Sequence, residues 1–229
     1  IPISSKFFVE LVVIDSSKEK YKPSFNGYKL LYKYTSPKGI YNAQNLGISI
    51  SSGDFIIVMN SGDGFSKNSI KLLEKISVDS EYDAFVFSQN YRKKNGEIIF
   101  TYNASSSSVW PHQSVVIRKK IHDNFGVYPT SYKYTAEQIY FSEIRSKIKV
   151  YYSKDILSYF THGGVSTGSL LFSLSKENFI LWRKLKRGVV FSFFKSFIFP
   201  IFKFFLVEKF QLYELGNKLR KLFDSNIRL

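Results

Sequence analysis

The chain has 229 residues, enough for one domain of ordinary size or for one domain with an appendage, and it lacks cysteine, which excludes disulfides and thiolate metal sites. It is 44% hydrophobic and 22% charged, a composition that excludes a disordered chain. Its net charge of +15 favours an anionic partner: nucleic acid, a membrane surface or a phosphorylated substrate.

Apolar runs and turn residues alternate along the chain. The predicted elements are strands at 7–15 and 28–34, a helix through Ile40 and Ile50, a strand at 55–59, a helix at 66–77 capped by Ser66, a strand at 82–88, a hairpin turn at Asn95-Gly96, a strand at 114–117, helices at 118–124 and 136–148, and two short strands near Val150 and Leu157. This order predicts an α/β fold with a mainly parallel sheet, to which the hairpin adds antiparallel strands.

Two acidic residues follow predicted strands. Asp15 ends VELVVID, and Asp63 ends FIIVMNSGD. Asn, Ser, Gly and Asp are turn formers, so a simple turn accounts for either acid. Ligands of open α/β sheets, however, bind at the carboxyl ends of strands, where a carboxylate can hold a divalent metal beside a phosphate.

Five segments together carry a resemblance to a known family. SPKGIYNAQNLGISISSGDFIIVMNSGD, residues 36–63, resembles a signature of family 2 glycosyltransferases of the GT-A fold. The other four follow the order of that family: VELVVIDSS, WPHQSVVIRKK, YTAEQIYFSEI and FTHGGVST. The resemblance covers residues 9 to 168. It implies a mixed sheet flanked by helices in a catalytic domain at 1–170, followed by a helical tail at 171–229.

The chain also departs from the family's pattern. The family's first strand has no counterpart before Ile1, so we expect the start of the domain to be missing. Glu137 stands where Asp is usual, and Asn42 where Asp is common. These departures leave an alternative open, a truncated and inactive relative that binds a membrane or a partner.

The resemblance implies transfer of a sugar from a nucleotide-diphosphate donor, expected to be a UDP-sugar, to a hydroxyl of a lipid-linked or saccharide acceptor. It further implies inversion, Mn²⁺ or Mg²⁺ as cofactor, and a place in the synthesis of O-antigen, capsule or other envelope polysaccharide in bacteria. The implied site residues are Asp63 for the metal, Glu137 as catalytic base, Asp15, Lys38, Gly39, Asn45, Asn60 and Gly62 for the nucleotide sugar, and His112, Gln113 and His162 on the acceptor or phosphate side.

Each of these roles has a structural alternative. Glu137 is also a favourable first-turn acid of a helix, and His112 is also explained as a hydrogen-bonded structural residue. The glycines after His162 are equally explained by backbone conformations of positive φ. His122, on a short basic helix, is expected at the surface.

The tail combines basic and apolar residues. Residues 176–229 hold 12 Lys/Arg and 4 Asp/Glu, and 14 of the 19 residues at 189–207 are apolar. Lys195 and Lys203 disfavour a simple membrane span. With Ser192 and Ser196 they form one helical face opposite a Phe-rich face, which predicts a helix lying on an anionic membrane. The alternative is a helix packed on the catalytic domain through Phe191, Phe194, Phe197 and Phe205.

These features predict a peripheral protein at the cytoplasmic face of the inner (plasma) membrane. A basic, aromatic chain is also compatible with a nucleic-acid-binding protein. The apolar character of the basic tail and the absence of a recognised DNA or RNA motif argue against that interpretation.

Overall fold

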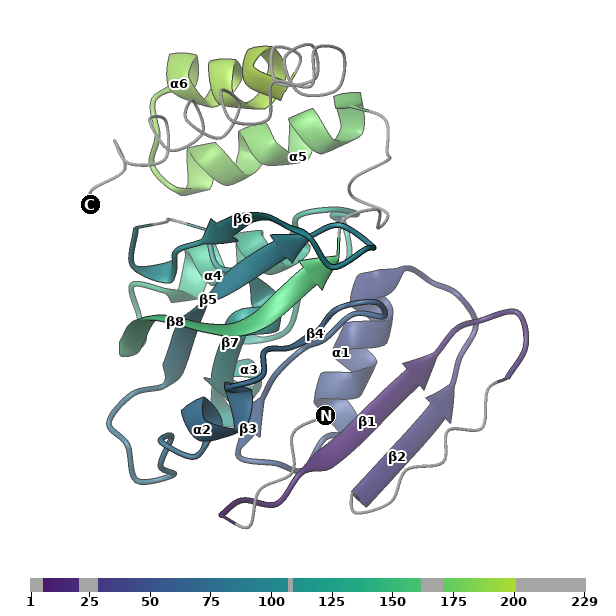
Figure 1. Cartoon of the computed structure of the whole chain (residues 1–229). Helices are drawn as coiled ribbons and strands as arrows, with labels where there is room; N and C mark the ends of the chain where they lie inside the picture. The colour runs from purple at the N-terminus through teal and green to yellow at the C-terminus, as the bar shows by residue number, and fades with distance from the viewer. Residues whose placement is uncertain (1–5, 21–28, 107–108, 162–170, 201–229) are drawn as a thin grey trace.

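A computed structural model of the chain describes residues 6–20, 29–106, 109–161 and 171–200 (Figure 1). Its elements are β1 (Glu10–Asp15), β2 (Lys29–Tyr34), α1 (Ile40–Ile50), β3 (Phe55–Ile56), β4 (Gly64–Phe65), α2 (Ser69–Leu73), β5 (Ala84–Arg92), β6 (Ile98–Tyr102), η1 (Ala104–Ser106), η2 (His112–Ser114), β7 (Val115–Arg118), α3 (Lys119–Phe125), α4 (Ala136–Ile144), β8 (Val150–Thr161), α5 (Leu171–Lys184), α6 (Val189–Phe193) and the π-helical turn η3 (Phe194–Ile198). The predicted alternation of strands and helices is confirmed.

The described strands form two sheets. β1 and β2 pair in parallel, and the larger sheet has the order β3-β7-β5-β8-β4 with β6 paired to β5. In the larger sheet only β5 and β8 run parallel, so the prediction of a mainly parallel sheet is wrong for these residues. Parallel neighbours need a long crossover, and the segment from β5 to β8 provides one in the larger sheet, whereas the turn at Asn95-Gly96 joins β5 and β6 as an antiparallel hairpin.

The predicted boundaries differ most near Ser66. The helix expected at 66–77 is confined to Ser69–Leu73, with Asn68 at its N-cap. Ser66 does not cap it, because its backbone N–H and hydroxyl donate to the carbonyls of Leu157 and Ile156, at 2.8 and 2.6 Å. The two short strands predicted near Val150 and Leu157 are one strand, β8.

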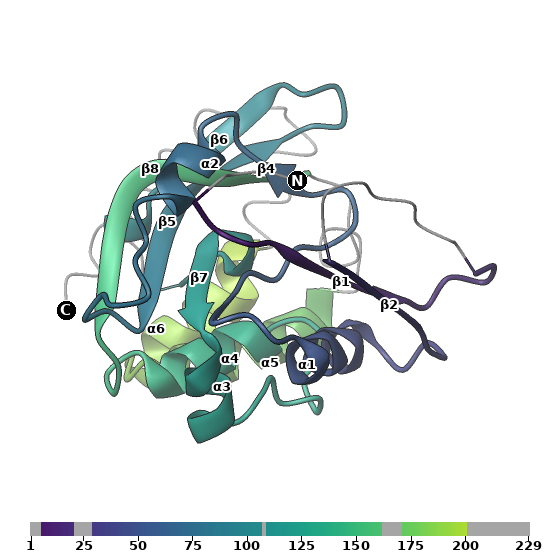
Figure 2. The same cartoon turned by 90° about the horizontal axis from the view of Figure 1, so that it is seen from below.

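The larger sheet is covered on both faces. Along β5, Ala84 and Val86 pack into a cluster with α3 and α4, and Phe85 and Phe87 pack on the opposite face with Leu72 of α2. This alternation is the period of two that a strand imposes on its side chains. Figure 2 shows α3 and α4 on one side of the strands and α2 on the other.

Helix α1 lies on the side of the strands that α3 and α4 occupy (Figure 2). Tyr41 and Ile48 belong to the core cluster that includes α4 and β5. On the other side of the helix, Gly47 faces β1, since a Cβ there would make an ordinary contact of 3.5 Å with Cγ1 of Ile14. Helix α1 therefore packs against both sheets.

The first tail helix packs on the domain that precedes it. Leu181 and Trp182 of α5, with Leu185 just after the helix, form a cluster with Ile139 of α4. Glu143 of α4 forms an ion pair with Lys184 of α5, with 2.5 Å between Oε1 and Nζ. None of the helices in the described part of the chain has the length and apolarity that a membrane crossing needs.

His122 is buried, so the prediction of a surface position is wrong. Only 3% of the residue is exposed, because Ile121 and His122 form the inner side of the short helix α3. Its ring stacks on Tyr140 at 5.2 Å, and neither ring nitrogen has a hydrogen-bond partner among the described residues. Burial lowers the pKa of His122 to about 4.

This burial makes stability depend on pH. The pKa of His122 lies below its ordinary value of 6.5, so the unfolded chain takes up a proton first, and stability falls as pH drops from 6.5 towards 4. We predict that, because of His122, the free energy of unfolding of the wild type falls by about 2 kcal/mol when the pH is lowered from 7 to 5. Urea unfolding at both pH values should show a smaller loss in His122→Leu. An equal loss in the two proteins would refute the assignment.

Candidate active site

Asp63 lies in the turn that joins β3 to β4, and both of its carboxylate oxygens accept hydrogen bonds. Oδ1 accepts from the backbone N–H of Thr161 at 3.0 Å, and Oδ2 accepts from the side-chain amide of Gln113 at 2.7 Å. Gly62 before it has φ of +90°, which favours glycine, and its carbonyl accepts from the Thr161 hydroxyl at 2.7 Å. The end of β8 and the turn η2 therefore aim this carboxylate.

The electrostatic setting of Asp63 is that of a partly desolvated acid. Burial raises its pKa above the ordinary value, although the bonds from Thr161 and Gln113 and the charges of His112 and Arg92 act in the opposite direction. The charged form is therefore incompletely compensated. A cation bound at this carboxylate would favour that form.

His112 connects Asn60 to Glu137. Its Nε2 lies 3.0 Å from the amide nitrogen of Asn60, and its Nδ1 lies 3.6 Å from Oε1 of Glu137. The Asn60 carbonyl oxygen accepts from Gln44 at 2.8 Å, which orients the Asn60 amide as a donor to His112. A neutral His112 therefore carries its proton on Nδ1, facing the Glu137 carboxylate.

Glu137 sits in the first turn of α4, where it is 8% exposed. Its Oε2 accepts a hydrogen bond from the Tyr41 hydroxyl. Burial acts to raise the pKa of Glu137, but the interactions with His112 and Tyr41 outweigh it and hold the pKa below the ordinary value. Glu137 is thus a carboxylate at neutral pH. The hydrogen bond from Tyr41, in the first turn of α1, links this carboxylate to that helix.

The N-terminus of α4 is capped from the tail. The Glu177 carboxylate of α5 accepts from the backbone N–H groups of Lys133, Tyr134 and Thr135 at 2.8, 2.8 and 3.0 Å, and from the Thr135 hydroxyl at 3.1 Å. A carboxylate is favourable at this end of a helix. Glu137 follows Thr135 by two residues, so Glu177 holds the segment that carries the candidate base.

A second group of predicted residues surrounds the N-terminus of α1. Lys38 and Gly39 line a cavity of about 160 Å³ together with Ser16, Thr35, Ser36, Asn42, Ala43 and Leu46. Gly39 precedes the helix with φ of +100°, and no side chain caps it. The lysine and the helix N-terminus make this cavity suitable for an anion.

Asp15 ends β1 beside this cavity. Its Oδ2 accepts from the Tyr32 hydroxyl at 2.6 Å, and its Oδ1 accepts from the backbone N–H and hydroxyl of Ser17 at 2.8 and 2.6 Å. These bonds stabilise the turn at Ser16, a cavity-lining residue. The role of Asp15 in nucleotide binding stays a prediction.

Asn45 faces a different segment of the chain. Its side-chain amide donates to the carbonyl of Tyr128 at 2.8 Å and accepts from the Tyr128 N–H at 3.0 Å. This pair of bonds ties α1 to the loop before α4, and the predicted contact of Asn45 with a nucleotide sugar stays a prediction. His162 lies outside the described residues.

The structure therefore joins six predicted residues in one hydrogen-bonded neighbourhood and places Lys38, Gly39 and Asp15 in another. The first group comprises Asn60, Gly62, Asp63, His112, Gln113 and Glu137. Sequence reasoning missed Tyr41, Gln44, Thr161 and Glu177, all of which act from distant segments. Tyr41, Gln44 and Thr161 lie in segments that resemble the family, whereas Glu177 lies outside them.

The residues fit a metal that takes most of its ligands from a substrate. The described residues contain no group of three or more acids or histidines able to hold an ion. Mg²⁺ commonly binds through one or two carboxylates together with substrate phosphates and water. Asp63, oriented by Thr161 and Gln113, can supply that carboxylate.

Comparisons with known proteins support the fold. No family model matches the sequence, nor does any curated protein. Residues 1–349 of S. aureus TarS, solved with UDP-GlcNAc, resemble the chain with a TM-score of 0.57 and 14% identity over 80% of this chain. The mannosyltransferase PcManGT from Pyrobaculum calidifontis, solved with GDP-Man and Mn²⁺, resembles it with a TM-score of 0.54 and 12% identity over 78% of this chain.

These likenesses confirm the predicted fold class. The chain has the mixed α/β architecture of GT-A glycosyltransferases, with helices on both faces of a curled sheet. It spans 60% of the TarS structure and 55% of the mannosyltransferase. At such identities the similarity shows the fold.

The Glu177 cap leads to a prediction about stability. Glu177→Ala leaves three N–H groups before α4 without their acceptor, which should lower the free energy of unfolding by about 1–3 kcal/mol. The matched control is Glu143→Ala, which removes an exposed acid of the ion pair with Lys184 and should change it by less than about 1 kcal/mol. Equal effects in urea unfolding would show that the cap does not stabilise α4.

Proposed function

We propose that the chain transfers a sugar from a nucleotide-diphosphate donor to an acceptor hydroxyl. The observation that carries this proposal is the convergence of Asp63 and Glu137, through Gln113 and His112, at the strand ends of a GT-A fold. The solved TarS and PcManGT structures hold UDP-GlcNAc and GDP-Man, which supports a nucleotide sugar as donor.

The proposed donor side uses α1 and Asp63. Lys38 and the N-terminus of α1 bind phosphate in the cavity beside Asp15, which contacts the nucleoside of a UDP-sugar. Asp63 holds Mn²⁺ or Mg²⁺, which when bound neutralises the charge of the leaving diphosphate. The Mn²⁺ in the PcManGT structure supports a divalent ion here.

The proposed acceptor side uses Glu137. Its lowered pKa keeps the carboxylate ready to accept a proton from the acceptor hydroxyl at neutral pH. Tyr41 and His112 hold its two oxygens in place, and the hydroxyl exchanges for one of these contacts as it binds. In the proposed single displacement, the hydroxyl oxygen attacks the anomeric carbon as the bond to the diphosphate breaks and Glu137 takes the proton, so the anomeric centre is inverted.

The metal assignment predicts the behaviour of Asp63 variants. The full chain, incubated with a panel of sugar nucleotides and Mn²⁺ or Mg²⁺, should release nucleoside diphosphate, and EDTA should abolish the release. Asp63→Ala should reduce turnover by about 100-fold or more, because the leaving diphosphate loses its stabilisation. Asp54→Asn, a change of an exposed acid before β3, is the control. Undiminished turnover in Asp63→Ala would remove the metal assignment.

We also propose that the tail docks peripherally on an anionic membrane at the cytoplasmic face, where a lipid-linked acceptor for envelope polysaccharide would be accessible. Ser192, Lys195 and Ser196 are buried, whereas the other side of α6 and η3 is apolar and exposed. Its exposed residues are Val189, Val190, Phe193, Phe194 and Ile198. The polar face predicted from the sequence therefore packs inward, so the outward face is the apolar one that an interfacial helix needs.

Basic residues next to this apolar face support an anionic surface as its partner. Arg183 and Lys184 in the last turn of α5, and Lys186 just after it, are exposed. Basic residues near an anionic leaflet contribute about 1 kcal/mol each. Of the residues that the packed-helix alternative would bury, Phe191 packs on Trp182 and Phe197 on Phe179, whereas Phe194 is 37% exposed. Phe205 lies outside the described residues.

Membrane docking predicts a specific effect of changing the apolar face. Val190→Ser combined with Phe193→Ser should lower the partition coefficient onto vesicles of 30% phosphatidylglycerol by about tenfold or more, because two apolar side chains are lost. Co-sedimentation measures the change. Val78→Ser, at an exposed valine on the loop after α2, is the matched control. Equal binding of the double variant and the wild type would contradict docking through α6.

A further inference from the structure

Arg92 stands at the end of the sheet where the candidate active site lies. It ends β5, and the parallel register places it opposite Thr161, which ends β8. Its Nε donates to the Thr161 hydroxyl at 3.3 Å, and Thr161 in turn holds Asp63. The carboxyl ends of neighbouring parallel strands are the edge at which ligands of α/β sheets bind.

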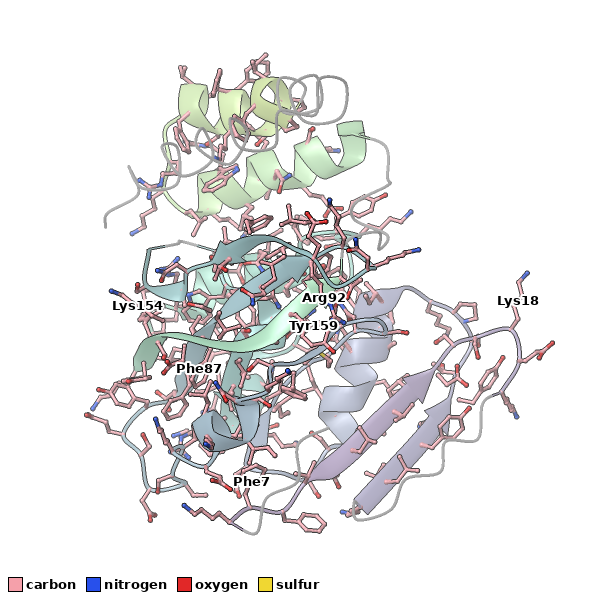
Figure 3. The ribbon with its side chains drawn as sticks, in the orientation of Figure 1. Phe7, Lys18, Phe87, Arg92, Lys154 and Tyr159 are labelled. Atoms are coloured by element: carbon pink, nitrogen blue, oxygen red, sulfur yellow. The ribbon has the colours of Figure 1, made fainter. Side chains whose placement is uncertain are left out.

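The guanidinium of Arg92 is held in a fixed plane. It lies over the ring of Tyr159 with 3.3 Å between its Cζ and the ring centroid. Figure 3 shows the two residues together at the arrowhead ends of β5 and β8. The ring is packed tightly against β4, since a Cβ on Gly64 would lie 2.3 Å from the Tyr159 hydroxyl oxygen. The missing side chain of Gly64, the residue after Asp63, therefore leaves room for the Tyr159 ring on which the Arg92 guanidinium stacks.

The charge of Arg92 has no carboxylate partner in the described part of the chain. Of the ion pairs there, none includes Arg92, although its charge acts on Asp63. Both Asp63 oxygens are already engaged by Thr161 and Gln113. The neighbouring Lys93 differs, since it pairs with Glu97 at 2.9 Å on the surface.

These features together describe a receptor for an oxyanion. A planar guanidinium, stacked on one face and bonded through Nε, keeps its terminal N–H groups in a fork that matches phosphate geometry. Its position beside Asp63, a carboxylate with an incompletely compensated charge, suits a ligand that brings both phosphate and a cation.

We infer that Arg92, positioned by Tyr159 and Thr161, binds a phosphate group in the site of Asp63. This inference rests on the proposed function for the identity of the ligand. The phosphate belongs either to the diphosphate of the donor or to a phosphate-bearing acceptor. Arg92 lies on β5, apart from the residues that line the α1 cavity, so it adds a second phosphate contact to that of Lys38.

The test measures binding of simple probes to the full chain by titration calorimetry in Mg²⁺. UDP and inorganic pyrophosphate probe the donor source, with uridine as the phosphate-free control. Citronellyl phosphate probes the acceptor source, with citronellol as its control. Arg92→Gln should weaken one of the two phosphate classes by about tenfold or more, because it removes charged hydrogen bonds. It should leave uridine and citronellol unchanged.

Two further variants guard against a trivial loss. Arg92→Lys keeps the charge without the planar fork, so its phosphate affinity should lie between those of Arg92→Gln and the wild type. Lys154→Gln removes one exposed charge near the start of β8, as Figure 3 shows, and should match the wild type. Thermal unfolding checks that each variant is folded.

The outcomes separate this inference from the proposed function. Weakened UDP and pyrophosphate binding assigns Arg92 to the donor, and weakened citronellyl phosphate binding alone assigns it to the acceptor. Arg92-dependent pyrophosphate binding without turnover of any sugar nucleotide supports the phosphate site while refuting glycosyl transfer. Unchanged affinities in Arg92→Gln, or a wild type that binds no phosphate probe, would overturn the inference.

Discussion

The Asp63 carboxylate joins three parts of the chain that meet only in the folded protein. Thr161 is 98 residues away in sequence and Gln113 is 50 residues away, yet each donates to one oxygen of this carboxylate. The bonds require the ends of β8 and η2 to lie beside the turn after β3. Any slip of β8 against β5 would move Thr161 away from Asp63. The strand register and the geometry of the site therefore depend on each other.

Helix α1 couples the two groups of candidate residues. Its preceding residues, Lys38 and Gly39, line the cavity, whereas Tyr41 reaches Glu137 and Gln44 reaches Asn60. Lys38 and Gln44 are separated by less than two helical turns, so α1 would hold a ligand in the cavity close to a group bound at Glu137. This arrangement suits a reaction in which a donor and an acceptor must be held together.

Helix α5 of the tail contacts both the segment that carries Glu137 and the surface of α4. Glu177 of α5 caps the segment that presents Glu137, and Trp182 contacts α4 through the same cluster as Ile139. Beyond α5, the chain buries Ser192 and Ser196 and exposes Val190. A helix with its polar residues inward and its apolar residues outward is arranged for an apolar surrounding, which is the physical basis for the proposed docking.

Local sequence determined the elements whose signals are local. The spacing of Ile40, Ala43, Leu46 and Ile50 predicted the helix α1, and Asn95-Gly96 predicted the hairpin of β5 and β6. The signature at 36–63 indicated the fold, and it marked Asp63 and Asn60 because a turn of that composition follows a strand there. The short helix α2 and the single strand β8 were misjudged, since Ser66 bonds to a strand 90 residues away instead of capping a helix.

The sequence by itself determined which residues carry charge and where the main turns fall, because backbone propensity and hydrophobic period act between near neighbours. Only the tertiary structure decided that His122 is buried, that Arg92 stacks on Tyr159 beside Asp63, and that Glu177 caps α4. Each of these depends on strand order and packing between distant segments. A lone histidine, arginine or glutamate has no periodic signal that reveals its partner.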